Sequence, residues 1–444
     1  MPNGSTNQWF SGIMSYSSNR LYRSIYILST LLVIALLSPA KAESFLWDAV
    51  SKNDVDKAKT LISFGANVNQ KNAYGNPIIH HAVAEGNLEI VELLISKGAD
   101  VNAKGQFDRV ALHYANKKGM AKTLLAHRAI VDTPTNYGET PLHWAASGVN
   151  GFGKQVDLVE FAEVLIANGA DVNKKTGEGR SNKTPLNYAA ESNNLPVAKI
   201  LIAHGADVDG GGSSPLSSAG GNGDYVEMAQ LLVEHGAGVN TPSIGGWYPL
   251  HSAAGRGNIN VTNYLLAHGA DPNATTTNRD KYTALYVASG SDYHAKVVES
   301  LLKSGANPNI RIANSLVPLH MATSEGAIKT VEVLLDHKAE INIATSDGTT
   351  PLHLGITLGK NDNRKDVVAL LLKNGANVNT LNIRSGMTPL TEAINRNDVD
   401  IVKLLISNGA DLNIMGIVGN KALAAARNSI AITDLLKEHG AHQP

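Results

Sequence analysis

Residues 88–102 read LEIVELLISKGADVN, and the last five letters mark a motif that returns along the chain. Copies of this pattern, Gly-Ala-Asp/Asn-x-Asn, usually start about 31 to 37 residues apart. Self-similarity at such a period predicts a solenoid made of one repeated supersecondary unit. Close copies start at Gly65, Gly98, Gly169, Gly205, Gly236, Gly269, Gly305, Gly375 and Gly409, and degenerate copies lie at Arg128, Lys338 and Gly440.

A second motif, Thr-Pro-Leu-His, precedes most copies of the first. A Thr at the N-cap accepts hydrogen bonds from free amides, and Pro at the first helical position costs no hydrogen bond. Each copy therefore predicts the start of a short helix. The motif is complete at 140–143 and 350–353, and shortened or altered at 184–186, 249–251, 283–285, 318–320 and 388–390.

The segment between the two motifs predicts a second helix. In residues 88–96 the apolar side chains recur at spacings of three and four, the pattern of one helix face. Lys97 and Gly98 then suit a helix C-terminus, because Gly adopts the left-handed cap and a cation favours the negative end. The Asp/Asn-x-Asn that follows predicts a turn-rich loop projecting outward.

One such pair cannot bury its apolar faces alone, so neighbouring pairs must stack. We therefore predict an all-α solenoid of about twelve helix-turn-helix units with projecting hairpin loops, from Glu43 to the C-terminus. The first unit, 44–69, is expected to cap one end. The last, 420–443, is expected to cap the other, since its final helix carries Asp434, Lys437 and Glu438.

The two motifs in fixed order resemble the ankyrin-repeat family over residues 43–444, and the resemblance implies a binding rather than a catalytic role. Some units depart from the pattern. The third begins at Val110 without Thr-Pro, and the sixth follows a Gly run at 210–212 that leaves little room for a loop. We expect a local irregularity or hinge there. Insertions at 148–155 and 359–364 lengthen two connections.

The N-terminal residues 1–42 predict a secretory signal peptide. Arg20 and Arg23 precede an apolar run at 25–37, and a small-x-small site ends at Ala42. The run is shorter than the roughly 20 residues that span a bilayer. Export to a periplasm or to the outside is expected, with membrane anchoring by an uncleaved segment as the alternative. Met14 is an alternative start.

Composition excludes several kinds of site. The chain has no Cys, so disulfides and Cys-based zinc sites are absent, and its formal net charge of -1 gives no pull toward nucleic acid. Most of the 15 His lie at fixed places in the repeat, too far apart to share an ion. The resemblance implies that those near the first helix start are structural. We expect no metal, no cofactor and no enzymatic activity.

One segment resembles a phosphate-binding loop. Residues 148–154 fit Gly-x4-Gly-Lys, but Gln155 stands where a Ser or Thr would hold magnesium. A nucleotide-binding protein is therefore the remote alternative to an exported protein-binding scaffold or a secreted effector acting on host proteins.

A protein partner is expected to bind the loop tips and the concave face made by the first helices. Aromatic side chains and Arg dominate many interfaces. Trp247 and Tyr282 are the strongest candidates, because they come from adjacent units and suit one apolar patch. The chain is expected to be a monomer. The candidate residues are Tyr74, Phe107, Arg109, Tyr137, Trp144, Trp247, Arg256, Tyr282, Leu316, Arg384 and Met387.

Overall fold

The computed structural model describes residues 39–148, 158–177, 182–357, 363–414, 422–426 and 429–441. In these ranges the chain forms helices and two isolated β-bridges, Lys71 with Pro77 and Thr275 with Thr283, and no strand. The signal peptide prediction lies outside the described residues, except that helix α2 starts at Pro39. The phosphate-loop-like segment lies outside them beyond Gly148.

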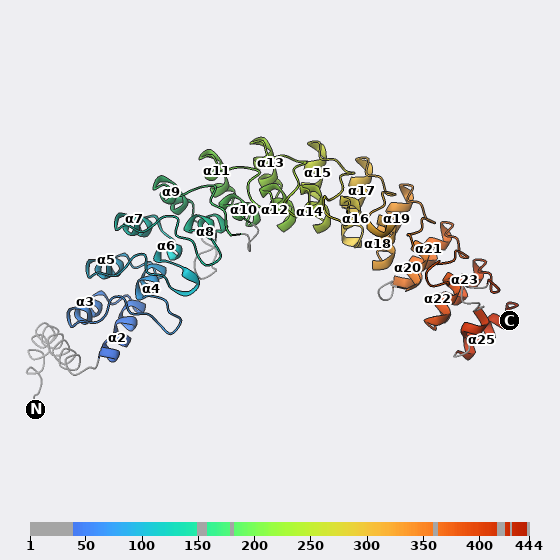
Figure 1. Cartoon of the computed structure of the whole chain (residues 1–444), viewed down its shortest axis with the longest axis horizontal. Helices are drawn as coiled ribbons and strands as arrows, with labels where there is room; N and C mark the ends of the chain where they lie inside the picture. Colours follow the sequence, from blue (N-terminus) through green and yellow to red (C-terminus); the bar gives the residue numbers. More distant parts are fainter. Residues whose placement is uncertain are drawn as a thin grey trace, which may run out of the picture. The chain divides into compact units, whose positions relative to one another are not determined.

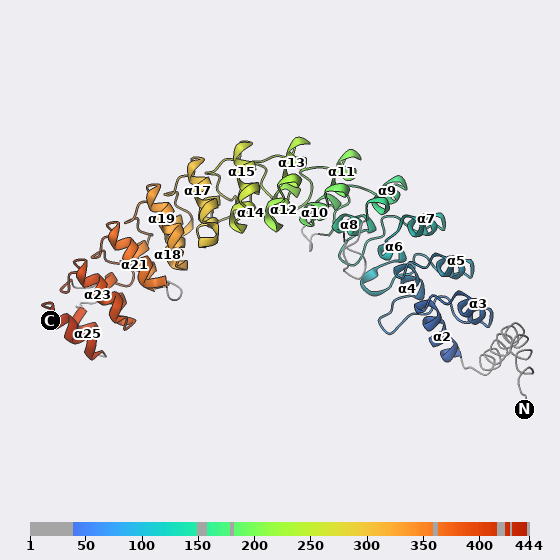
Figure 2. The same ribbon diagram turned by 180° about the vertical axis from the view of Figure 1, so that it is seen from behind.

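The chain divides into two compact units, 1–176 and 177–444. Within each, the even-numbered helices form one row and the odd-numbered helices another (Figures 1 and 2). The described helices of the first unit are α2 (Pro39–Ser51), α3 (Val55–Ser63), α4 (Ile78–Ala84), α5 (Leu88–Ser96), η1 (Gln106–Asp108), α6 (Ala111–Tyr114), α7 (Lys118–Ala126), α8 (Pro141–Ser147) and α9 (Val159–Ala167).

The second unit continues the alternation, so helices α2 to α25 make twelve pairs across the described residues, as the repeat predicted. Its helices are α10 (Pro185–Glu191), α11 (Leu195–Ala203), α12 (Pro215–Asn222), α13 (Val226–Glu234), α14 (Pro249–Arg256), α15 (Ile259–Ala267), α16 (Ala284–Ala288), η3 (Asp292–His294), α17 (Ala295–Lys303), η4 (Ala313–Ser315), α18 (Pro318–Glu325), α19 (Ile328–Asp336), α20 (Pro351–Thr357), α21 (Arg364–Lys373), α22 (Pro389–Asn395), α23 (Val399–Ser407), α24 (Ala422–Ala425) and α25 (Ile430–Glu438).

The Thr-Pro motif starts the first helix of a pair, as predicted. Thr184, for example, is the N-cap of α10, and its side chain accepts a hydrogen bond from the backbone N–H of Asn187. Pro185 follows in the first turn, where no backbone donor is needed. The unit without Thr-Pro has the short helix α6, which begins after Val110 and ends at Tyr114.

The core runs between neighbouring pairs. First helices pack on first helices, as α10 on α12 and α12 on α14, and second helices pack on second helices, as α11 on α13. The Leu at the third position of the Thr-Pro-Leu motif, or of its altered copies, is buried in nine described pairs, and full burial of one such side chain contributes about 1.5–3 kcal/mol. These residues are Leu112, Leu142, Leu186, Leu216, Leu250, Leu285, Leu319, Leu352 and Leu390.

The last Asn of the Gly-Ala-Asp/Asn-x-Asn motif joins consecutive pairs, a contact that the sequence analysis did not predict. Asn273 donates from Nδ2 to the carbonyl of Gly305 at 3.0 Å and accepts at Oδ1 from the N–H of Asn307 at 2.7 Å. We call this repeated pair of bonds the asparagine ladder. Its other complete members are Asn69, Asn102, Asn240, Asn309, Asn342 and Asn379.

Backbone bonds also join consecutive hairpin loops near their tips. The N–H of Thr277 donates to the carbonyl of Gly246 at 3.0 Å, and the N–H of Ala313 to that of Asp280 at 3.0 Å. The sixth pair carries the predicted irregularity, since its loop is shortened to a bend at 211–213. Ile244 of the next loop still donates to Gly212 at 2.9 Å, so the loop contact is retained. The hinge stays a prediction.

Candidate functional site

The histidines of the Thr-Pro-Leu-His motif are structural in geometry. Nδ1 of His320 accepts from the backbone N–H of Val317 at 3.2 Å, and its Nε2 donates to the carbonyl of Thr349 in the next pair at 3.2 Å. His113 makes the same two bonds, to Val110 and Glu139. A neutral ring with its proton on Nε2 satisfies both partners.

Burial holds these rings neutral. It lowers the pKa of His80, His113, His320 and His353 to about 4, and hydrogen bonds to backbone carbonyls offset only part of the effect. His80 and His81 illustrate the difference between adjacent side chains. Nε2 of His80 contacts the carbonyl of Ala103, whereas that of His81 contacts the hydroxyl of Ser51. The two rings therefore do not chelate together.

The histidines that follow the second helices hydrogen-bond to backbone carbonyls in the last turn of the same helix. Nδ1 of His204 lies 2.8 Å from the carbonyl of Ile200, and His235, His268 and His439 repeat this bond. Within the described ranges, no group of three or more His, Cys, Asp or Glu side chains is placed to hold a metal ion.

Four candidate residues of the first unit gather in one cluster, here called the Arg109 cluster: Phe107, Arg109, Tyr137 and Trp144. The guanidinium carbon of Arg109 lies 4.5 Å from the centre of the Trp144 ring and 5.2 Å from that of Phe107, within cation–π range. Phe107 and Tyr137 have ring centres 5.9 Å apart. Two consecutive pairs, α6/α7 and α8/α9, thus contribute to one surface of aromatic rings around a cation.

The strongest sequence candidates meet in the second unit. The ring centres of Trp247 and Tyr282 are 6.2 Å apart, and Tyr282 stacks on Tyr286 at 5.4 Å with an interplanar angle of 12°. These three residues form the Trp247 cluster. Trp247 and Tyr282 are each partly exposed, so the patch is open to a partner while its rings are held in place. The sequence analysis did not single out Tyr286, which lies on α16 four residues after Tyr282.

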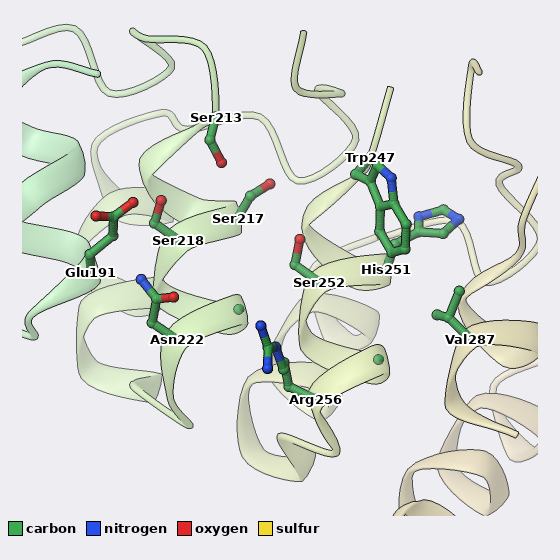
Figure 3. A pocket seen from close by; sticks show the side chains of 12 residues that line it. Glu191, Ser213, Ser217, Ser218, Asn222, Trp247, His251, Ser252, Arg256 and Val287 are labelled. Carbon is green, nitrogen blue, oxygen red and sulfur yellow. The ribbon is translucent and has the colours of Figure 1, made fainter. Parts of the chain in front are cut away.

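A pocket of about 400 Å³ lies beside the Trp247 cluster on the first helices α10, α12, α14 and α16. Figure 3 shows Trp247 and Val287 on one side, Glu191 on the other, and hydroxyl groups between them. We call it the serine pocket, because four of its side chains are serines: Ser213, Ser217, Ser218 and Ser252. Arg256, a sequence candidate, also lines it.

The other candidates are more scattered. Leu316 and Arg384 line a second pocket of about 320 Å³ that also contains Asp347. The sulfur of Met387 receives a hydrogen bond from Asn395, and the residue is only partly exposed. Tyr74 is 73% exposed at a loop tip. The candidates therefore gather around Arg109 in the first unit and around Trp247 in the second, and Arg256, Leu316 and Arg384 line pockets.

Family models for ankyrin repeats match most of the chain. The model for three consecutive repeats matches residues 103–176, 153–243, 239–312, 312–382 and 360–443, and the model for many copies matches residues 46–95. Together these ranges cover most of the helix pairs described above. The chain belongs to the ankyrin-repeat family. Ankyrin repeats generally mediate protein–protein interaction without catalysis, so a protein partner is indicated.

Several proteins resemble this ankyrin-repeat chain over part of their length. The Ankyrin repeat and KH domain-containing protein mask-1 of Caenorhabditis elegans is 31% identical over 47% of this chain and 7% of its own length. Human SH3 and multiple ankyrin repeat domains protein 2 is 30% identical over 43% of this chain and 10% of its own length. The mouse B-cell lymphoma 3 protein homolog is 31% identical over 34% of this chain and 33% of its own length. The chain thus spans at most about a third of these relatives.

The solved ankyrin repeat domain of human ASB11 is 28% identical, with a TM-score of 0.45. The alignment covers 52% of this chain and all of that domain. In the part of the chain that the structure describes, no helix has the length and apolar character needed to cross a membrane.

Proposed function

We propose that this ankyrin-repeat chain is an exported, non-catalytic scaffold that binds a protein partner through the exposed side of its first helices and hairpin loops. The Trp247 cluster is the observation that carries the proposal. Its rings lie side by side and are supplied by two adjacent pairs, and those of Trp247 and Tyr282 remain partly open to solvent. Aromatic residues held in this way lose little conformational freedom on binding and often dominate interface energy.

The Arg109 cluster supports the same reading in the first unit. Arg109 is fixed between two rings, and the indole N–H of Trp144 donates to the Glu139 carboxylate at 3.2 Å. Both clusters lie on first helices and their preceding loops, where sequence reasoning placed the partner.

A pull-down with the mature chain tests the binding role. We expect the double variant Trp247→Ala/Tyr282→Ala to lose the partner that the unaltered chain recovers. Tyr293→Ala is the matched control, because Tyr293 is 96% exposed in η3, outside the cluster. Circular dichroism of the variants must show unchanged helix content. Equal recovery by the double variant would reject this placement of the site.

Export is the second part of the proposal, and it rests on residues 1–42. The arginines, the apolar run at 25–37 and the small residues before Glu43 are the features of a signal peptide. N-terminal sequencing of the chain recovered from an expressing bacterium is expected to begin at Glu43. An intact N-terminus in the membrane fraction would favour the anchored form instead, and recovery from the cytoplasm would reject export.

The identity of the partner decides between two scaffolds of the same fold. A partner from the producing cell indicates a scaffold of its own envelope, whereas a host protein indicates a secreted effector. Cross-linking of the mature chain in each setting, followed by identification of the attached protein, separates them.

A further inference from the structure

The serine pocket forms where two neighbouring first helices, α12 and α14, carry small residues in place of large ones. The first residue after the motif His position is large on most first helices, such as Tyr188 on α10 and Met321 on α18. On α12 and α14 it is Ser218 and Ser252, and one turn later both helices carry Gly. These small residues make the floor of a pocket of about 400 Å³ between Glu191 and Val287 (Figure 3).

A missing ring deepens the pocket on α12. At the motif His position α12 has Ser217, whereas α14 has His251, whose Nε2 reaches the carbonyl of Tyr282 in the following pair at 2.8 Å. The hydroxyl of Ser217 is too short for the equivalent contact and bonds instead to Ser214, from which it accepts at 3.0 Å. The space that a histidine ring would fill opens toward Trp247.

The floor presents hydroxyl groups that have no acceptor among the described residues. Ser218 is only 5% exposed and points into the pocket in Figure 3, and no described group hydrogen-bonds to its Oγ. The proton of the Ser217 hydroxyl is also uncommitted, since Ser217 acts as acceptor in its one side-chain bond. Hydroxyl groups that line a pocket can donate their protons to a bound molecule, so these groups favour a ligand that accepts hydrogen bonds.

The charges at the rim have the sign that such a ligand needs. The carboxylate of Glu191 is neutralised by the ammonium of Lys183 at 2.6 Å. His251 is uncharged at neutral pH, because burial lowers its pKa. The guanidinium of Arg256 is exposed and has no ion-pair partner among the described residues. The pocket therefore has one uncompensated positive charge beside several hydroxyl donors.

We propose that the serine pocket binds an acidic side chain, Asp or Glu, of an extended segment of a protein partner. Arg256 pairs with the carboxylate, the hydroxyls of Ser218 and Ser252 donate to its oxygens, and the Trp247 ring covers the aliphatic part. A charge-assisted bond to Arg and several hydroxyl donors suit a planar carboxylate. This inference rests on the proposed binding function and adds the chemistry of the partner.

Binding of the full chain to immobilised pools of short peptides tests the inference. The pools share degenerate flanks and differ in one central residue, which is Glu, Gln, Lys or phosphoserine. We expect the Glu pool to retain the chain about tenfold better than the Gln pool, which corresponds to one charge-assisted hydrogen bond. Arg256→Gln should abolish the preference, and Arg128→Gln, at an exposed helix end in the first unit, should retain it.

A second variant fills the pocket without removing charge. Ser252→Leu places at this position the residue that α20 carries as Leu354, so the helix accommodates it. It should lose binding to the Glu pool while its thermal unfolding stays cooperative. Equal retention of the Glu and Gln pools, or a Glu preference that survives Arg256→Gln, would overturn the inference.

Two further outcomes are decisive. Stronger retention on the phosphoserine pool than on the Glu pool would overturn the carboxylate assignment in favour of a tetrahedral anion. The peptide pools can show no Glu preference while the partner pull-down still depends on Trp247 and Tyr282. That combination would reject the proposal of an acidic side chain and would leave the proposed scaffold function in place.

Discussion

The side-chain oxygen of Asn309 accepts a hydrogen bond from the backbone N–H of Glu340, 2.8 Å away in the next helix pair. The amide nitrogen of Asn309 donates to the carbonyl of Lys338 at 3.2 Å. One side chain thus satisfies a donor and an acceptor that would otherwise meet water at the end of α19. The asparagine ladder repeats this contact in both units.

Asn309→Ala should lower the free energy of unfolding by about 1–2 kcal/mol, because two partly exposed hydrogen bonds are lost. Asn309→Asp should cost roughly half as much, since a carboxylate keeps the acceptor and loses the donor. Asp209 shows that the chain uses this arrangement, because its carboxylate accepts from the N–H of Gly238 at 3.1 Å. Urea unfolding of the three proteins measures the difference; equal stability of all three would contradict the role of the ladder.

Lys338→Gly should raise the free energy of unfolding by about 1 kcal/mol. Lys338 follows α19 with a φ of 66°, in the left-handed region, where a side chain costs about that amount. Gly305 fills the equivalent place after α17 with a φ of 92°. Gly305→Lys is the reciprocal change and should be destabilising. Thermal melts that move in the same direction for both variants would refute the argument.

Acidification below pH 6.5 should destabilise the fold through the buried histidines. His80, His113, His320 and His353 titrate near pH 4 when folded and near 6.5 when unfolded, so the unfolded chain binds more protons between those values. Their contribution is complete above pH 6.5 and is lost as the pH falls toward 4. Urea midpoints measured from pH 7.5 to 4 should decrease accordingly.

His320→Asn should weaken that acid dependence while preserving the local contacts. Asn187 occupies the motif His position of α10, where it accepts from the N–H of Thr184 and donates to the carbonyl of Ser213. The variant removes one titrating group, so its unfolding free energy should fall less steeply than that of the unaltered chain below pH 6.5. An identical slope would show that His320 does not contribute to acid sensitivity.

Glu392 should have the opposite effect on the pH dependence of stability: its contribution should decrease as the pH rises. Burial raises its pKa to about 8, partly offset by Arg396, and its Oε2 has no hydrogen-bond partner in the described residues. The folded chain then holds a proton that the unfolded chain releases above about 4.5, so this contribution to stability declines as the pH rises from 4.5 to 8. Glu392→Gln should remove the decline, which urea unfolding at pH 5 and pH 8 measures.

The repeat period and the two motifs predicted the fold because each pair is local in sequence. Thr184 and Pro185 start a helix, and a left-handed Gly ends one, through contacts within a few residues. The closeness of Trp247 and Tyr282 followed from their equivalent places in adjacent pairs. Such relations depend on the period alone.

The serine pocket and the asparagine ladder were missed because they depend on contacts between pairs. Ser218 and Ser252 have no distinctive local sequence pattern. Only an alignment of the repeats shows that both occupy a position where most other first helices carry a large side chain. The Asn of the motif equally suits a turn, so its bonds to the next pair have no separate signal in the sequence. Aligning the pairs by motif position would have pointed to both.

The bonds of the asparagine ladder join the last residue of one motif copy to the third residue of the next, for example Asn273 to Asn307 and Asn309 to Glu340. If one whole pair is removed, the two ends brought together present the same donors and acceptors. The array can therefore lose or duplicate one helix pair and still form the hydrogen bonds between the pairs that become neighbours. A gene encoding such a chain has a ready route to vary the spacing between its binding sites without inventing a new junction.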